Sequence, residues 1–262
     1  MKSKYLEMFS SEERSLKCKL DALCNEWQKV VGEPQDLWFV PDGFYPNYLS
    51  QKVKILYLGR DSYDLYGSED VRGEQTYIEK FIRQYISGVM DNGESVNRFK
   101  FHKMLIQVAY GLIHGCSWSD VPYASEICRE GRIFEKTSFA FMNLCKWSHE
   151  SGEYGAEWTA DWKTIDKFVE LSVANKRNFI LEEIGLLEPD VIITMNFGVE
   201  RIQRLFSVSS PVEECDDCYV YSLARPLGKC LVLDSWHFSS RNKSEDKNVY
   251  EPLRRMIKKH LK

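Results

Sequence analysis

The sequence lacks a long apolar run and lacks a strong excess of basic charge. Residues 1–7 are not followed by an apolar stretch, so we expect neither a secretory signal nor a membrane partner. The formal net charge of -4 argues against a broadly basic surface of the kind that binds nucleic acid nonspecifically. Residues 236–262 are an exception, with eight Lys and Arg against three acidic residues. They form either a local basic surface or the solvated face of a C-terminal helix.

Motifs for nucleotide hydrolysis and for structural metals are also missing. There is no Gly-x-x-x-x-Gly-Lys-Ser/Thr loop, which argues against nucleotide hydrolysis. Of the eight cysteines, only Cys215 and Cys218 form a Cys-x-x-Cys pair, and no further ligands stand near them. We therefore expect a turn carrying two thiols, with no metal and no cofactor. Cysteines in a chain without an export signal are typical of reduced thiols, so we expect a cytoplasmic protein.

No low-complexity linker and no internal repeat divides the 262 residues. We expect one domain over 1–262, in which 1–50 form an N-terminal helix and an aromatic lead-in loop. Four apolar runs predict strands, and helical patterns separate them. This alternation predicts an α/β fold in which a central, mainly parallel four-stranded sheet is flanked by helices. The strands are expected at 53–58, 137–144, 191–195 and 230–233.

Apolar residues at helical spacing predict the helices. The first begins at a capping box, Ser10 to Glu13, and runs to about Val31. Its buried stripe is predicted to comprise Leu16, Leu20, Leu23, Trp27 and Val30. Residues 209–229 are expected to form an irregular or hairpin excursion. Further helices are expected at about 76–87, 101–114, 162–187 with a break near Asn178, 199–206 and 248–261.

Short polar motifs mark three of the predicted strands. Gly59-Arg60-Asp61-Ser62-Tyr63 ends the first strand, Asn143 lies in the second, and His237-Phe238-Ser239 follows the fourth. Ligands bind at the carboxyl ends of the strands in an open α/β sheet. We therefore expect Asp61, Asn143 and His237 to line one pocket. A carboxylate, an amide and an imidazole together suit recognition of a polar heterocycle and catalysis at the bond that holds it.

These motifs, in this order, resemble those of the uracil-DNA glycosylase superfamily. The segment from Gly59 to Tyr63 is similar to its Gly-x-Asp-Pro-Tyr motif, and His237-Phe238-Ser239 is similar to its His-Pro-Ser motif. Asn143 in an apolar strand, and the strand at 189–194 before Gly198, also fit. The resemblance covers about residues 50–260 and implies the three-layer α/β fold of that family. Ser62 and Phe238 replace two prolines, and no four-cysteine set matches the iron–sulfur members, so no cluster is implied.

The resemblance implies a role for each matching residue. Asp61 would orient or activate water and stabilise the oxocarbenium-like sugar. His237 would hydrogen-bond a base carbonyl and stabilise the leaving anion. Asn143 would read the Watson–Crick edge of a flipped-out base. Tyr63 would form one wall of the base pocket, and Gly59 would lie beside the base. Three further matches would contact DNA: Ser62, Ser239 on the backbone phosphate, and Arg241 at the position of the wedge that enters the duplex.

The implied function is hydrolysis of the N-glycosidic bond of uracil, or of a related damaged base, in single-stranded or damaged duplex DNA. Such cleavage builds positive charge on the sugar and negative charge on the base, and it requires the base outside the stack. Two alternatives remain. One is a non-catalytic module on the same fold that binds a base, a nucleotide or a single strand, and the other is an enzyme that cleaves free nucleosides.

Each candidate residue also has a structural alternative. Asp61 is also suited to cap the element after its strand, and His237 to pack in the core. A buried Asn143 needs a partner for its amide, so it could instead bridge to a neighbouring loop. No aromatic residue stands at the family's usual short distance after the first motif, and Phe81 or Tyr66 would have to stack on the base.

Overall fold

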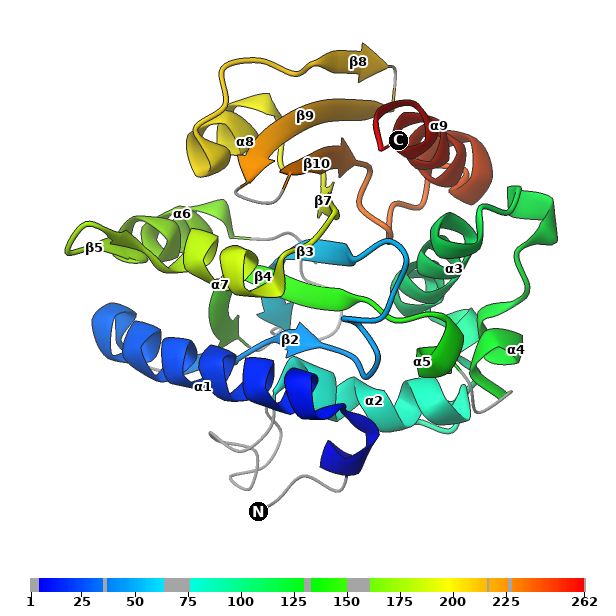
Figure 1. The fold of residues 1–262 in the computed structure, drawn as a ribbon, viewed down its shortest axis with the longest axis horizontal. Helices are drawn as coiled ribbons and strands as arrows, with labels where there is room; N and C mark the ends of the chain where they lie inside the picture. The colour runs from blue at the N-terminus through cyan, green and yellow to red at the C-terminus, as the bar shows by residue number, and fades with distance from the viewer. Residues whose placement is uncertain are drawn as a thin grey trace.

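Four parallel strands form the centre of the sheet. The computed structural model describes residues 5–34, 37–63, 76–129, 133–149, 161–215, 217–225 and 228–261. Each predicted strand is present, and every neighbouring pair at the centre is parallel (Figure 1). The prediction of an α/β fold with a mainly parallel centre is therefore confirmed. The strands lie in the order β4 (Ala140–His149), β3 (Ile55–Tyr63), β7 (Val191–Met195) and β10 (Gly228–Ser235).

The prediction of four strands is wrong, because antiparallel strands extend the described sheet to eight. β1 (Trp38–Phe39) and β2 (Gly43–Phe44) both pair with β4. They have two residues each, which is too short for an alternating pattern to be read from sequence. On the other side β9 (Cys218–Arg225) pairs with β10, and β8 (Glu213–Cys215) pairs with β9. The predicted excursion at 209–229 is thus a hairpin.

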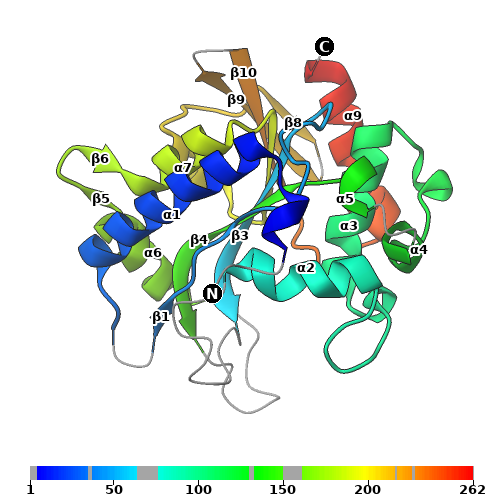
Figure 2. The same ribbon diagram turned by 60° about the horizontal axis from the view of Figure 1, so that its bottom comes forward.

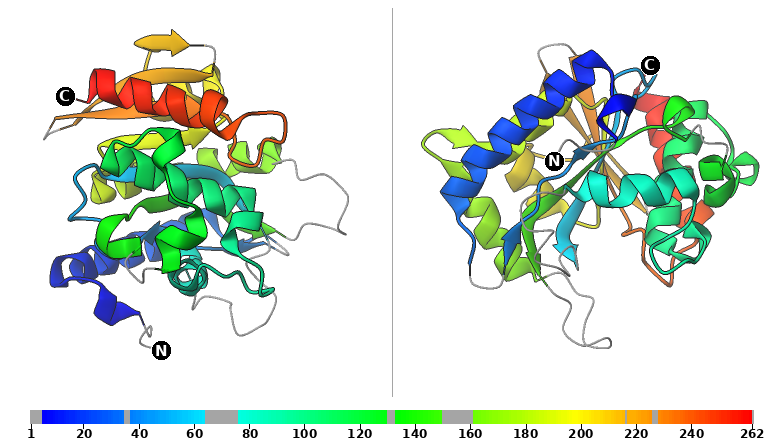
Figure 3. Two further views of the ribbon diagram at one scale, coloured as in Figure 1. Left: turned by 90° about the vertical axis from the view of Figure 1, so that its right-hand side faces the viewer. Right: turned by 90° about the horizontal axis from the view of Figure 1, so that it is seen from below.

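Helices cover both faces of the sheet. Figure 3 shows α1 (Ser11–Val31), α6 (Trp162–Leu171) and α7 (Phe179–Leu187) on one face, and Figure 2 shows α2 (Tyr77–Ser87) and α3 (Lys100–His114) on the other. The inner strands are therefore apolar on both sides, which explains the continuous apolar runs in the sequence. None of the described helices is long and apolar enough to cross a bilayer.

The remaining described elements are short. They are η1 (Leu6–Met8), η3 (Val96–Arg98), α4 (Ala124–Arg129), η4 (Trp118–Asp120), α5 (Ile133–Lys136), α8 (Val199–Phe206), a separate pair of strands β5 (Val173–Ala174) and β6 (Arg177–Asn178), the π-helical η5 (Glu245–Tyr250), and α9 (Glu251–His260). The C-terminal helix predicted from residue 248 therefore starts as a π-helical turn.

The N-terminal helix begins as predicted. Ser10 Oγ accepts a hydrogen bond from the Glu13 N–H, and the Glu13 carboxylate accepts one from the Ser10 N–H, which completes the capping box. The predicted stripe is buried except at its end, where Val31 faces the core and Val30 is exposed.

The segment predicted as a helix over 162–187 with a break near Asn178 forms two helices, and the break contains the unpredicted β5–β6 hairpin between α6 and α7. The residues of the hairpin turn, Asn175 and Lys176, have φ angles of 53° and 66°, which an α-helix does not permit. The predicted break near Asn178 is confirmed, since its side chain caps α7.

Helix α3 packs against η5 so closely at Gly111 that no side chain fits there. A Cβ at Gly111 would lie 2.3 Å from Tyr250 Oη and 2.6 Å from Cε2 of the same ring. Tyr250 is buried, and its hydroxyl donates a hydrogen bond to the Cys116 carbonyl at 2.7 Å. The ring therefore has little room to move.

We expect Gly111→Ala to lower the free energy of unfolding by about 1–3 kcal/mol, because the new methyl group overpacks this contact. Denaturant unfolding measures the change. Gly185→Ala is the matched control, since Gly185 lies inside α7 and a Cβ built there would have nothing within 4 Å. This substitution should raise the free energy of unfolding by up to about 1 kcal/mol, because alanine favours the helix more than glycine does. A similar effect of both substitutions would show that the Tyr250 contact is not tight.

Candidate functional site

β3 and β4 lie side by side, continue beyond the end of β7, and carry three of the predicted site residues. Gly59 is the register partner of Asn143, and Asp61 pairs with Cys145. β7 and β10 end at the same edge of the sheet, because all four central strands are parallel. His237 follows the end of β10 by two residues. The predicted carboxyl, amide and imidazole groups therefore come from one edge of the sheet.

Arg60 links these strand ends, although the sequence motifs did not assign it a role. Its Nε donates to the Met195 carbonyl at 3.3 Å and its Nη2 to the Asn196 carbonyl at 3.1 Å. The guanidinium carbon lies 5.2 Å from the centre of the Trp162 ring. Arg60 also acts electrostatically on both Asp61 and His237. The two predicted catalytic groups thus share one anchored positive neighbour.

The turn that holds Arg60 is itself fixed by Asp234, near the end of β10. One oxygen of this carboxylate accepts from the Thr194 hydroxyl at 2.7 Å and the Phe197 N–H at 2.9 Å, and the other accepts from the Gly198 N–H at 2.8 Å. These bonds tie the residues that follow β7 to β10. The carbonyl groups that accept from Arg60 are therefore held in place.

Asp61 has an unusual acid strength for a carboxyl group. Burial raises its pKa to about 7, Arg60 opposes the rise, and Asp161 adds to it. At neutral pH the side chain is therefore divided between its protonated and charged forms. A carboxyl whose pKa lies close to the working pH is well suited to exchange a proton with a bound water.

His237 is held as a neutral hydrogen-bond donor. Its Nδ1 accepts a hydrogen bond from the Ser239 backbone N–H at 3.2 Å, so the ring proton lies on Nε2. Burial, followed by the charge of Arg60, lowers the imidazole pKa to about 4. At neutral pH the ring therefore carries no charge and offers one N–H.

Packing holds the loop that carries His237. The ring of Phe101 lies parallel to the imidazole, with centroids 5.7 Å apart and planes 19° apart. Phe238 is buried and packs edge-on against Tyr57 at 5.6 Å, which restrains the loop where the resembling family has proline. Lys100 Nζ hydrogen-bonds to the Ser240 carbonyl in the same loop. The first turn of α3 therefore supports the predicted catalytic histidine.

Asn143 is 2% exposed, and its amide bridges to Asp42. Its backbone N–H donates to Asp42 Oδ2 at 2.6 Å, and its Nδ2 donates to Asp42 Oδ1 at 3.4 Å. This is the bridge to a neighbouring loop that was the structural alternative for this residue. A Cβ at position 59 would lie 2.6 Å from Asn143 Oδ1. The amide oxygen therefore occupies space that Gly59 leaves open.

Asp42 belongs to a buried ionic cluster. Lys146 Nζ lies 2.6 Å from Asp42 Oδ2 and 2.8 Å from Glu183 Oε2, and the three side chains are at most 1% exposed. Burial raises the pKa of both carboxyl groups, and Lys146 opposes that rise. Two carboxylates and one ammonium would carry a net negative charge, so the cluster favours retaining a proton on one carboxyl.

The other predicted residues are described only in part. Ser62 and Tyr63 continue β3 beside Ser148 and His149, but the side chains of Ser62 and Tyr63 lie outside the described residues, as does Tyr66. Ser239 and Arg241 are exposed in the loop after β10. Phe81, the other suggested stacking residue, packs against the His102 ring at 4.6 Å.

Sequence patterns could have found some of the residues that they missed. Arg60 lies inside the first motif, next to Asp61. Asp42 lies in Pro41-Asp42-Gly43, within the predicted lead-in loop, and Phe101 is the first residue of the helix predicted over 101–114. Their contacts come from strands and loops distant in sequence, which no local pattern reveals.

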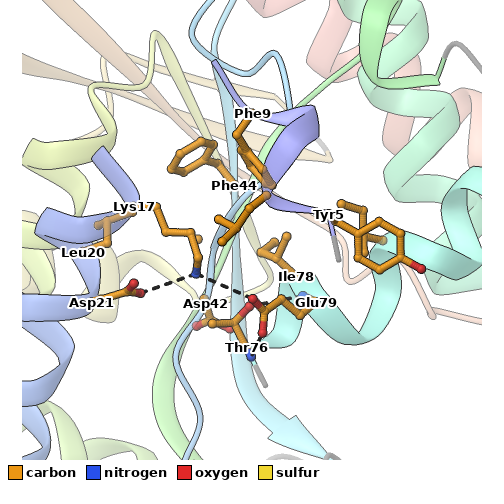
Figure 4. A pocket seen from close by; sticks show the side chains of 13 residues that line it. Tyr5, Phe9, Lys17, Leu20, Asp21, Asp42, Phe44, Thr76, Ile78 and Glu79 are labelled. Atoms are coloured by element: carbon orange, nitrogen blue, oxygen red, sulfur yellow. Dashed lines mark hydrogen bonds and ion pairs between the residues drawn. The ribbon is translucent and has the colours of Figure 1, made fainter. Parts of the chain in front are cut away.

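A small cavity between α1 and α2 reaches Asp42 (Figure 4). Phe44 lines it together with Lys17, whose Nζ lies 3.5 Å from Asp21 Oδ1 and 3.9 Å from Glu79 Oε1. Its volume of about 20 Å³ admits a water molecule. The cavity is far smaller than a ligand pocket, which has about 300 Å³ or more, so it is not the site of a base.

Within the described ranges, no three His, Cys, Asp or Glu side chains gather as metal ligands would. Cys215 and Cys218 are register partners across the β8–β9 turn, and both are free thiols. Neither a search of protein-family models nor one of curated proteins found a match to this chain. Function is therefore inferred from the side chains at the sheet edge and from the motifs that carry them.

Proposed function

We propose that this chain hydrolyses the N-glycosidic bond of uracil, or of a related damaged base, in DNA, as a divergent member of the uracil-DNA glycosylase superfamily. The observation that carries the proposal is that Asp61 and His237 both lie within the electrostatic influence of one anchored Arg60 at the carboxyl edge of the parallel sheet. Asn143 lies at the same edge on the neighbouring strand. The order of the motifs along the chain supports the same function.

The chemistry follows from where charge develops. As the bond between the sugar carbon and the base nitrogen breaks, the sugar becomes positive and the base negative. The Asp61 carboxylate stabilises the sugar cation, orients the attacking water and accepts its proton. The Nε2–H of His237 donates to a carbonyl oxygen of the leaving base, and the nearby Arg60 also favours the anion. One such donor contributes about 3 kcal/mol to the transition state.

Single-turnover base release tests the proposal directly. The substrate is a single-stranded oligonucleotide with one uracil, and alkali-labile strand cleavage measures the abasic product. The matched control carries thymine at the same position, and a duplex with the uracil opposite guanine tests strand preference. We expect release from the uracil strand. Absence of release from every uracil substrate would contradict the proposal.

We expect the release rate to rise with pH and to level off above about 7. The reaction needs the Asp61 carboxylate, and its pKa is about 7, so the active fraction falls about tenfold for each pH unit below that value. His237, with a pKa of about 4, should stay neutral from pH 5.5 upward and add no second inflection. A rate profile from pH 5.5 to 9 measures this.

Asp161→Asn is the matched variant for this profile. Asp161 raises the pKa of Asp61, and its side chain caps α6 by accepting the Lys163 N–H. Asparagine is an equally good cap but has no charge. The inflection should therefore move to lower pH. If the rate of base release in the parent protein does not change across pH 7, Asp61 does not take part in the rate-limiting step.

A non-catalytic base-binding module is the second candidate, and one observation favours it. Asp61 is partly protonated at neutral pH, and a protonated carboxyl binds a polar base without supporting cleavage. Tight binding of free uracil or of an abasic-site oligonucleotide, with no base release between pH 6 and 9, would favour the module. If the protein binds neither free uracil nor the abasic-site oligonucleotide, the hypothesis of a base-binding module is wrong.

A further inference from the structure

A larger cavity lies between the ends of β8 and β9 and the start of the C-terminal helix. Figure 1 shows α9 beside the adjoining ends of these two strands. Cys218 at the start of β9 pairs with Ser235 at the end of β10, so the cavity lies at the same edge of the sheet as His237. Its volume of about 360 Å³ falls in the range of ligand pockets. The residues that line it are Cys215, Asp217, Lys247, Glu251, Pro252 and Arg255. Two acidic and two basic residues therefore face one space.

Both acidic residues of the cavity already have basic partners. Asp217 Oδ1 accepts a hydrogen bond from the Trp236 indole N–H, and Lys243 Nζ lies 3.9 Å from the same oxygen. Arg254 Nη1 donates to Glu251 Oε2 at 3.1 Å. Neither Lys243 nor Arg254 lines the cavity. Each carboxylate is therefore compensated from outside the cavity wall.

The two basic residues of the cavity have no acidic partner. Lys247 and Arg255 are exposed, and within the described ranges neither side chain takes part in a hydrogen bond or an ion pair. Lys247, Glu251 and Arg255 follow one another at intervals of four residues, so they lie along one face of the helix that η5 and α9 form. Two positive charges therefore remain uncompensated in one cavity, which favours an anion as its ligand.

Trp236 connects this cavity to the predicted site. It immediately precedes His237, and its indole N–H is bonded to Asp217 in the cavity wall. The Lys243 ammonium lies 3.7 Å from the centre of the Trp236 ring. Arg60 acts electrostatically on His237, so basic groups extend from the sheet edge past Trp236 to the cavity. A polyanion bound at His237 therefore meets further positive charge in this direction.

We propose that Lys247 and Arg255 together bind one backbone phosphate of the DNA strand in this cavity, away from the nucleotide whose base is cleaved. This inference rests on the proposed function for the identity of its ligand. A phosphodiester carries one negative charge, and its oxygens accept from an ammonium and from the fork of a guanidinium. Such a contact carries no sequence information but fixes the position and direction of the strand. The cavity thus holds the strand in register while one base lies at the sheet edge.

Replacing both cations, Lys247→Gln together with Arg255→Gln, tests the contact without catalysis. The ligand is a fluorescent single strand that contains no uracil, and anisotropy measures its dissociation constant from about 50 to 200 mM salt. We expect the double variant to bind about tenfold more weakly at the lowest salt, because two exposed ion pairs are lost. The slope of log affinity against log salt should become shallower by about 0.7, because one phosphate of the strand is no longer neutralised.

Lys258→Gln together with Lys259→Gln is the matched control. Both lysines are exposed on α9, and neither lines the cavity, so the control removes the same charge from the same helix. We expect it to keep the affinity and the salt dependence of the parent protein. An unchanged affinity in the cavity variant, or an equal loss in both double variants, would overturn the proposal, because a general effect of surface charge acts on both alike.

A change in the strand tests the same contact from the side of the ligand. One uncharged methylphosphonate linkage is moved along the strand. We expect one position to weaken binding to the parent protein by about the factor that the double variant loses, and to have no effect on the double variant. Equal effects in both proteins at every position would overturn the proposal. Inorganic phosphate that binds the parent but not the double variant, without competing with the strand, would assign the cavity to a free phosphate compound and overturn the strand contact.

The phosphate site and the proposed function can fail separately. Strand binding that depends on Lys247 and Arg255, without release of any base, would refute the hydrolase and leave the phosphate site supported. Uracil release by a protein whose double variant binds the strand with unchanged salt dependence would refute the phosphate site alone.

Discussion

Replacing Asp61 with asparagine should lower the single-turnover rate of uracil release by about 10²–10³-fold. Asparagine keeps the shape of the side chain but cannot carry the negative charge that stabilises the sugar cation, and it cannot accept the water proton. The substitution should not weaken the fold, because burial already disfavours the charged form of this carboxyl. Uracil binding should change little, since the proposed contacts to the base come from His237 and Asn143.

Asp91→Asn is the matched control for this variant. Asp91 is an exposed aspartate that pairs with Arg83 on the surface, and its substitution should leave the rate unchanged. Thermal unfolding of both variants separates a lost chemical group from a lost fold. Full activity of Asp61→Asn at pH 7.5 would show that Asp61 is not the catalytic carboxylate, and the structural alternative for this residue would then be favoured.

Replacing Lys146 with methionine should lower the free energy of unfolding by about 3–5 kcal/mol at neutral pH. Methionine fills a similar volume but leaves Asp42 and Glu183 buried together without a cation, and uncompensated buried charge is among the costliest changes in a protein core. Lys54→Met is the matched control, because Lys54 pairs at 3.8 Å with Glu188, whose side chain is 57% exposed. Such a pair contributes at most about 1 kcal/mol.

The loss of unfolding free energy caused by Lys146→Met should depend on pH. Whether the loss grows or shrinks as pH rises follows from the number of protons that the folded and unfolded states bind. Without the ammonium, the two buried carboxyl groups hold their protons to higher pH than they do in the unfolded chain. The folded state then binds more protons than the unfolded state, so its stability falls as pH rises above the unfolded values of about 4. Urea unfolding should show a smaller deficit at pH 5 than at pH 8. An equal deficit at both would argue that the cost is one of packing alone.

The strongest sequence signals predicted the fold because they are local. A continuous apolar run such as 191–195 is what a strand covered on both faces requires, and the Ser10 capping box fixes the start of a helix by contacts within four residues. The two-residue strands β1 and β2 carry no such signal, because pairing with β4 defines them. The β5–β6 hairpin was missed because its turn residues adopt positive φ without glycine.

The candidate site was predictable only in outline. Strand-end placement predicted that Asp61, Asn143 and His237 would come from one edge, since that follows from parallel topology alone. It did not predict the anchoring of Arg60 by the carbonyl groups near the end of β7, and the alternative of a bridge from Asn143 to a neighbouring loop did not identify Asp42 as the partner. These contacts join segments that only the folded sheet brings together. The sequence therefore identified candidate side chains for the site, but it did not identify the residues that those side chains contact.

The close fit of Asn143 against Gly59 links the evolution of two positions. Any side chain at position 59 would meet the amide oxygen at 2.6 Å and the Phe141 ring at 3.0 Å. A lineage that gains a side chain at 59 must therefore first shorten or lose the residue at 143, whereas a lineage that keeps the amide is confined to glycine. Substitutions at the two positions are therefore coupled, and glycine at position 59 should accompany every descendant that keeps the amide at position 143.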